Sequence, residues 1–184
     1  MKLKLRFARL TMFVYIRLIR SWLSPLWYHL RTFRVRPRTN LWEDYKMLSA
    51  KEFEARVKRV KYTGDPWGGS LDYTVTDPDI FFAPGLPDCD CDDVAYMWYL
   101  WAEANRHEAW LIVVMDGLSI KSSHYFTVFR QGPDYILANY TIDMPRRSLD
   151  ACTAQFEKNY LTKWGRYVEP VIFIDKHCKE REEV

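Results

Sequence analysis

The stretch from Val94 to Ala102 is apolar on nearly every side of a helix, and it constrains the fold more than any other segment. A helix of this kind has to be surrounded by other elements, so we expect a helix over residues 91–106 to be central. Its start combines thiols with acids, in the run Asp88-Cys89-Asp90-Cys91-Asp92-Asp93. Because the N-terminus of a helix carries a partial positive charge, a thiol placed there ionises more readily. Cys91 is therefore a candidate nucleophile.

The chain around this helix alternates between helix and strand patterns. The capping-box pattern Ser49-Ala50-Lys51-Glu52 predicts a helix from about 50 to 61. Residues 63–90 are rich in Gly, Pro and Asp and predict an irregular binding rim, with a short helix at 78–83. Strands are predicted over 109–115, 124–130, 135–141 and 168–174, the last at a sheet edge because of Pro170, and a helix over 148–160. These elements predict an α+β fold.

The hairpin formed by the second and third strands is expected to bring a histidine and an amide together. A four-residue loop at 131–134 pairs Arg130 with Tyr135. Counting back along both strands makes His124 and Asn139 diagonal neighbours on one face, because strand side chains alternate. Asp143 lies on the same face, on the other diagonal. The sequence thus supplies a base and two possible orienting groups for it, in addition to the thiol.

Residues 1–40 differ sharply in charge from the rest of the chain. They contain ten Lys or Arg and no acid, whereas the remainder holds 17 bases against 24 acids. Over residues 2–23 most of the bases fall within an arc of about 80°, and the other positions are mostly apolar. We therefore divide the chain into a basic amphipathic arm over 1–40 and a domain over 41–184. The arm suits an anionic membrane surface or a partner protein and, with less support, nucleic acid.

The cysteines and the basic arm also indicate where in the cell the protein is found. Four cysteines, scattered along the chain, do not make a disulfide scaffold and favour a reducing compartment. No secretory signal is evident, and Arg17 and Arg20 interrupt the apolar run that a spanning helix needs. We expect a cytoplasmic or peripheral membrane protein, with association with a virion as an alternative.

The segment Cys91-Asp92-Asp93-Val94-Ala95 resembles the nucleophile segment of transglutaminase-like cysteine peptidases. In that family Gly-Asp-Cys-(Asp/Glu)-Asp and a small residue open the central helix, a histidine begins a strand, and an aspartate follows on the next strand. Here His124 and Asn139 stand at the corresponding positions. The loops Asp65-Pro66-Trp67-Gly68-Gly69 and Asp77-Pro78 are similar to those of small bacterial and phage members. The resemblance covers about residues 62–142.

This resemblance implies a papain-like fold, in which the helix packs on an antiparallel sheet and the site lies between them. It implies a Cys91-His124-Asn139 triad that hydrolyses a protein or peptide amide, or transfers its acyl group, through a thioester. Two departures from the family pattern stand out. The residues before Cys91 are Cys89-Asp90 where the family has Gly-Asp, and the third member of the triad is Asn rather than Asp. Asn also serves in papain-type triads.

Other roles for these residues are open. Cys89 is a rival nucleophile, and Trp67 could place its indole N–H near an oxyanion. Cys89, Cys91 and His124 together could bind zinc, although two cysteines one residue apart lack the usual ligand spacing. We expect neither a metal nor a cofactor. The rival functional class is an inactive papain-like scaffold that acts in assembly or membrane docking through its basic arm.

Overall fold

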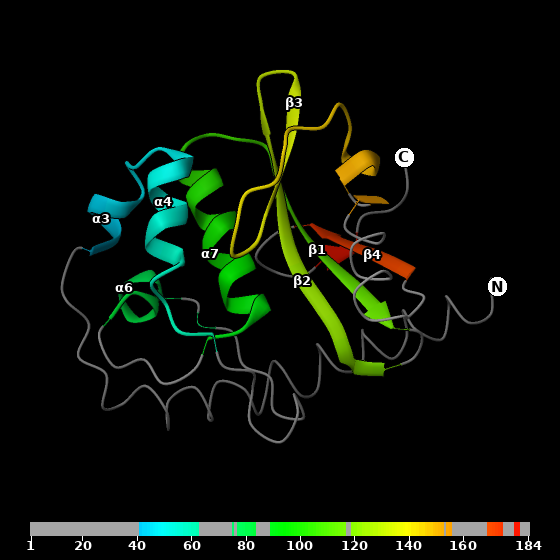
Figure 1. Cartoon of the computed structure of the whole chain (residues 1–184), viewed down its shortest axis with the longest axis horizontal. Helices are drawn as coiled ribbons and strands as arrows, with labels where there is room; N and C mark the ends of the chain where they lie inside the picture. The colour runs from blue at the N-terminus through cyan, green and yellow to red at the C-terminus, as the bar shows by residue number, and fades with distance from the viewer. Residues whose placement is uncertain are drawn as a thin grey trace.

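The computed structural model describes residues 41–62, 75, 77–83, 89–116, 119–152, 154–155, 169–174 and 179–180. The predicted arm over 1–40 and Trp67 lie outside the described residues, as does most of the predicted rim over 63–90. The described part has an α+β architecture, with helices packed against an antiparallel sheet (Figure 1). None of the helices described there is long and apolar enough to cross a bilayer.

In the described part of the chain, four helices precede the sheet: α3 (Leu41–Tyr45), α4 (Ala50–Val57), α6 (Pro78–Phe81) and α7 (Cys91–Ala104). The capping box predicted at the start of α4 is confirmed. The Ser49 backbone N–H donates to Glu52 Oε2 at 2.9 Å, and the Glu52 N–H donates to Ser49 Oγ at 3.4 Å. The helix ends at Val57, earlier than the predicted residue 61.

Over the described residues, the sheet has five strands in the order β3-β2-β1-β4-β5, all paired antiparallel. The strands are β1 (Ala109–Asp116), β2 (Ser119–Gln131), β3 (Asp134–Ala138), β4 (Glu169–Ile174) and β5 (Lys179–Glu180). The prediction that the strand containing Pro170 lies at an edge is wrong, because β4 lies between β1 and β5. The described pairing of β5 reaches only Phe173 and Ile174, so Pro170 pairs on the β1 side alone, with Val114. A proline fits there because it needs no second ladder partner.

The predicted register of the β2–β3 hairpin is confirmed: Arg130 pairs with Tyr135 and Thr127 with Ala138. The turn is shorter than expected, because Gln131 also pairs with Asp134, and Gly132 takes a positive φ of 61°. This extra pair leaves the register unchanged. β3 ends at Ala138 rather than residue 141, since the chain folds back there.

The two faces of the sheet are covered differently. On one face α7 packs with α4 in an aromatic core, in which the Phe53 ring lies 4.9 Å from Trp98 and 5.7 Å from Trp101. On the other face a smaller cluster includes Cys152, in a segment that is helical over the described residues 149–152 and 154–155. In Figure 1 the labelled helices gather on one side of the sheet and this segment on the other. The expectation that the helix at 91–106 is central is confirmed: ten of the fourteen residues of α7 are buried.

Candidate active site

Cys91 is the first residue of α7, as the sequence predicts, and its exposed fraction is 7%. Asp90 is the N-cap, with an extended backbone, and its carboxylate accepts from the Asp92 N–H at 3.3 Å. In return, Asp93 Oδ2 accepts from the Asp90 N–H at 3.1 Å. The helix therefore starts with a reciprocal capping box built from two aspartates. Sequence reasoning missed this box, although its three-residue spacing was readable.

Asp93 has a second role that the sequence did not reveal. Its Oδ1 accepts from the backbone N–H of Val75 at 2.5 Å, and both residues are almost fully buried. Nearby, Cys89 forms an isolated parallel bridge with Tyr62. A carboxylate of α7 thus ties the described part of the 63–90 segment to the helix start, over a separation of 18 residues. Hydrogen bonds of this kind compensate the cost of burying the charge.

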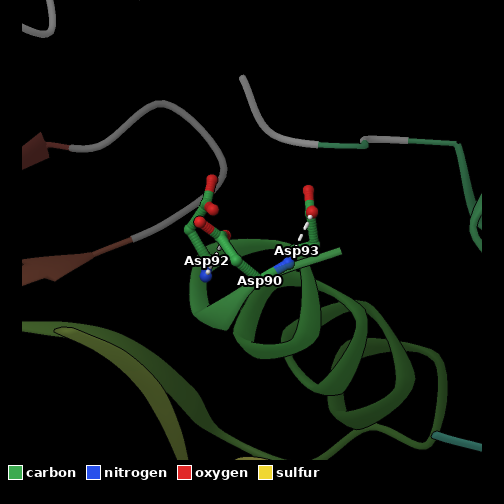
Figure 2. Close-up of side chains that lie close together, drawn as sticks. All are labelled: Asp90, Asp92 and Asp93. Carbon is green, nitrogen blue, oxygen red and sulfur yellow. Dashed lines mark hydrogen bonds between the residues drawn. The ribbon is translucent and has the colours of Figure 1, made fainter. Parts of the chain in front are cut away.

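Three carboxylates belong to residues that flank the candidate nucleophile in the chain. Figure 2 shows Asp90, Asp92 and Asp93 projecting from the start of α7, and their oxygens lie within 4.8 Å of one another. Their negative charge opposes ionisation of the Cys91 thiol, against the effect of the helix N-terminus. The hydrogen bonds described above already employ Asp90 and Asp93 as caps and ties. We therefore read the cluster as a structural element of the helix start.

The zinc alternative depends on ligand atoms that come together. Among the described residues, the group of side chains close enough to share a metal consists of the three aspartates alone. Cys89, Cys91 and His124 do not form such a group. The two cysteines lie in different local structures: Cys89 is in a backbone bridge, and Cys91 is in the helix.

His124 and Asn139 lie together, as the hairpin register predicts. The amide Nδ2 of Asn139 is 3.0 Å from Nε2 of the imidazole. Asp143, the other candidate, is exposed, and its backbone N–H donates to Leu137 O at 2.8 Å. Of the two possible orienting groups, the amide is thus the one found against the imidazole.

Asn139 is held by hydrogen bonds from several directions. Its backbone carbonyl accepts from the indole Nε1 of Trp98 in α7, and its backbone N–H donates to Thr141 O at 3.0 Å. Its side-chain oxygen accepts from the Tyr140 N–H at 2.8 Å. Its side-chain nitrogen donates to Tyr125 O of β2 at 3.2 Å. The residue therefore connects the central helix to the strand that carries the histidine.

The direction of α7 along β2 places Cys91 relative to His124. Thr127 Oγ1 donates to Ala95 O at 2.6 Å, and further along the helix the ring of Trp98 stacks on Phe129. Moving toward the start of α7 therefore means moving toward lower numbers in β2. Cys91 lies one turn before Ala95, so the first turn of the helix is at the His124 end of the strand.

Two further ionisable side chains have altered acidity. Burial raises the pKa of the Cys152 thiol from 9.0 to about 11, with a smaller opposing effect of Arg146. Burial also raises the pKa of Tyr140, and the nearby Cys89 and Tyr62 contribute in the same direction. The Tyr140 hydroxyl is buried without a hydrogen-bond partner. Cys152 is consequently a weak nucleophile at neutral pH, which makes it a useful internal reference.

No family model matches the chain, and comparisons with curated proteins and with solved structures found no match. The site is therefore described by its own geometry. A thiol begins the central helix, and an imidazole on β2, the strand against which that helix packs, contacts an amide directly after β3.

Proposed function

We propose that the protein is a cysteine-dependent amide hydrolase or acyltransferase with a papain-like, transglutaminase-like site. The observation that carries the proposal is the contact of Asn139 with His124 of β2, which lies on the side of Thr127 where α7 begins with Cys91. A thiol, an imidazole and an orienting group are the parts of an activated sulfur nucleophile. Their order along the chain, with the thiol on a helix, the imidazole on β2 and the amide directly after β3, matches the resemblance drawn from the sequence.

In the proposed reaction the Cys91 sulfur attacks the carbonyl carbon of a protein or peptide amide. His124 takes the thiol proton and returns it to the leaving amine, which generates a thioester on the sulfur. Attack by water on the thioester gives hydrolysis, and attack by an amine gives transamidation. The backbone N–H of Cys91 at the helix start contributes to binding the oxyanion.

The second candidate function is a scaffold without catalysis, and two observations favour it. The Cys91 side chain is largely buried, and the negative charge of three aspartates that neighbour it in the chain disfavours a thiolate. On this view the basic arm over 1–40 does the work, by docking to an anionic membrane surface, a partner protein or, with less support, nucleic acid. A peripheral membrane, cytoplasmic or virion-associated location accords with either function.

Thiol reactivity distinguishes the two functions. Under limiting iodoacetamide at neutral pH, followed by peptide mapping, we expect Cys91 to be alkylated before Cys89 and Cys152. Cys91 is the most exposed of these three, and Cys152 is buried with its pKa raised to about 11. The matched pair Cys91→Ala and Cys89→Ala completes the test, since only the first should abolish hydrolysis of amide substrates. Equal labelling of the cysteines, or labelling of Cys89 first, refutes the assignment of the nucleophile.

A further inference from the structure

The partners of the Asn139 amide determine which of its atoms faces the histidine. Amide oxygen and nitrogen are told apart by their hydrogen bonds. The oxygen accepts from the Tyr140 backbone N–H, and the nitrogen donates to the Tyr125 backbone carbonyl. Reversing the amide would set two donors against each other at Tyr140 and two acceptors against each other at Tyr125. Two backbone groups therefore lock the amide with its NH₂ group toward His124.

An NH₂ group of this kind can only donate, so its contact with the imidazole has one chemical meaning. One of its hydrogens is directed to Tyr125 O, and the other meets His124 Nε2 at 3.0 Å. Nε2 must supply the acceptor lone pair, and the neutral ring must carry its proton on Nδ1. We infer that Asn139 is a positioning residue that holds His124 as the neutral Nδ1–H tautomer. This arrangement also opposes the imidazolium, because a proton on Nε2 would face the amide hydrogens.

The inference rests on the proposed function in one respect: it concerns how the Asn139 contact prevents His124 from accepting the proton of Cys91. The Nε2 lone pair is occupied by Asn139, and Nδ1 already bears a proton, so neither ring nitrogen can take the proton of Cys91. For His124 to act as a base, the bond to Asn139 must break so that Nε2 can take the proton, or the ring proton must also move from Nδ1 to Nε2 so that Nδ1 can take it. The described arrangement is therefore a resting state of the proposed site.

A carboxylate in place of the Asn139 amide favours the opposite tautomer of His124. The oxygen introduced by Asn139→Asp accepts a hydrogen bond from a protonated Nε2, and the neutral ring then carries its acceptor lone pair on Nδ1, where it can take the thiol proton. The thiolate that forms is then paired with an imidazolium held by a carboxylate. The opposite exchange, carboxylate to amide, in a serine protease triad lowers kcat about 10⁴-fold because it enforces the wrong tautomer.

The tautomer can be read directly from the full-length chain. Long-range ¹H–¹⁵N spectra of the ¹⁵N-labelled protein at neutral pH should show a protonated Nδ1 and an unprotonated Nε2 for His124, assigned by the loss of these signals in His124→Gln. A ring protonated at Nε2, or at both nitrogens, overturns the inference. This measurement needs no substrate, and His124→Gln serves only to assign the signals, with the other histidine signals unchanged as the sign that it is folded.

The variants add a causal test. In Asn139→Asp we expect the proton to move to Nε2 and the ring to become protonated at a higher pH than in the wild type. Asn105→Asp is the matched control: it also removes amide donors, to Lys46 O and Trp101 O, but lies at the far end of α7. It should leave the His124 tautomer unchanged. If Asn139→Asp keeps the Nδ1–H form, the amide is not what holds the ring, and the inference fails.

Cys91 reactivity separates this inference from the proposed function. With the tautomer reversed, the Cys91 alkylation rate in Asn139→Asp should rise about tenfold or more, within the roughly 10⁴-fold scale of a triad tautomer effect. A reversed tautomer with an unchanged Cys91 rate supports the role of Asn139 and refutes His124 as the base for Cys91. Thermal melts by circular dichroism establish that both variants are folded.

Discussion

Trp98 connects the central helix to the backbone of Asn139, and its replacement by Phe tests how far the site depends on that connection. The indole is fully buried, and its Nε1–H donates to the Asn139 carbonyl. Phe can retain ring contacts with Phe53 and Phe129, which lie 4.9 and 6.1 Å from the indole centroid. The substitution therefore removes the donor and part of the ring, and little else.

The expected destabilisation has two parts. Leaving a partly buried carbonyl without its donor costs about 1–2 kcal/mol. The lost ring volume of about 40 Å³, at about 24 cal/mol per Å³ of residual cavity, costs about 1 kcal/mol more. We expect Trp98→Phe to lower the free energy of unfolding by about 2–3 kcal/mol.

Trp101→Phe is a closely matched control. Trp101 lies on the same helix, is 2% exposed, and donates its indole N–H to Leu48 O at 3.1 Å. The same atoms are removed, so a similar loss of stability is expected. Its hydrogen bond leads to the loop before α4 and not to Asn139. Only Trp98→Phe should therefore alter the His124 ring signals.

Urea unfolding followed by far-UV circular dichroism measures the stability of both variants, and ring ¹H–¹⁵N spectra report on His124. A loss below about 1 kcal/mol in Trp98→Phe would show that the indole hydrogen bond and packing matter less than the structure indicates. His124 signals that change equally in both variants would show that general loosening of α7, and not the link to Asn139, is responsible.

Two other predictions concern the cap of α4 and the arm that precedes the domain. Ser49→Ala should lower the free energy of unfolding by about 1 kcal/mol at neutral pH, against a smaller effect of Lys51→Ala. The hydrogen bonds from Ser49 lower the pKa of Glu52, so their contribution to stability is present above pH 4.5 and is lost as pH falls through the lowered pKa. Urea unfolding of wild type and Ser49→Ala at neutral and acidic pH should therefore show that the difference in free energy of unfolding between them becomes smaller in acid. Deleting residues 1–40 should abolish sedimentation with anionic vesicles while leaving the 41–184 domain folded, since each base near such a surface contributes about 1 kcal/mol. Full-length protein that ignores vesicles but loses an oligomer on truncation, or that instead binds nucleic acid with steep salt dependence, would refute the membrane role.

Local patterns in the sequence were sufficient for the elements that carry the site. The start of α7 at Cys91 and the capping box at Ser49 follow from side chains that bond backbone groups within three residues. The pairing of Arg130 with Tyr135 follows from strand alternation around a short turn, and the contact of His124 with Asn139 follows from that pairing. These features depend on neighbours close in sequence or in one hairpin, so local sequence patterns predict where α7 starts and how the hairpin pairs, although the capping box of α7 itself was missed.

Elements that depend on distant partners were not readable in this way. The position of β4 inside the sheet depends on β5, a two-residue strand with no pattern of its own. The tie between Asp93 and Val75 joins a helix to an irregular segment, and no spacing rule predicts it. An edge strand differs from an interior strand only in lacking a pairing partner on one side, and the tertiary fold decides whether that partner is present.

The amino-acid sequence by itself determined that a thiol, an imidazole and an amide would be carried by the central helix and the hairpin beside it. Only the tertiary structure decided which end of the Asn139 amide faces His124. That choice depends on the backbone groups of Tyr125 and Tyr140, while Trp98 of α7 fixes the Asn139 carbonyl. The two ends of an amide are almost the same size but opposite in hydrogen-bonding character. Their orientation is therefore set by the donors and acceptors that folding brings around them.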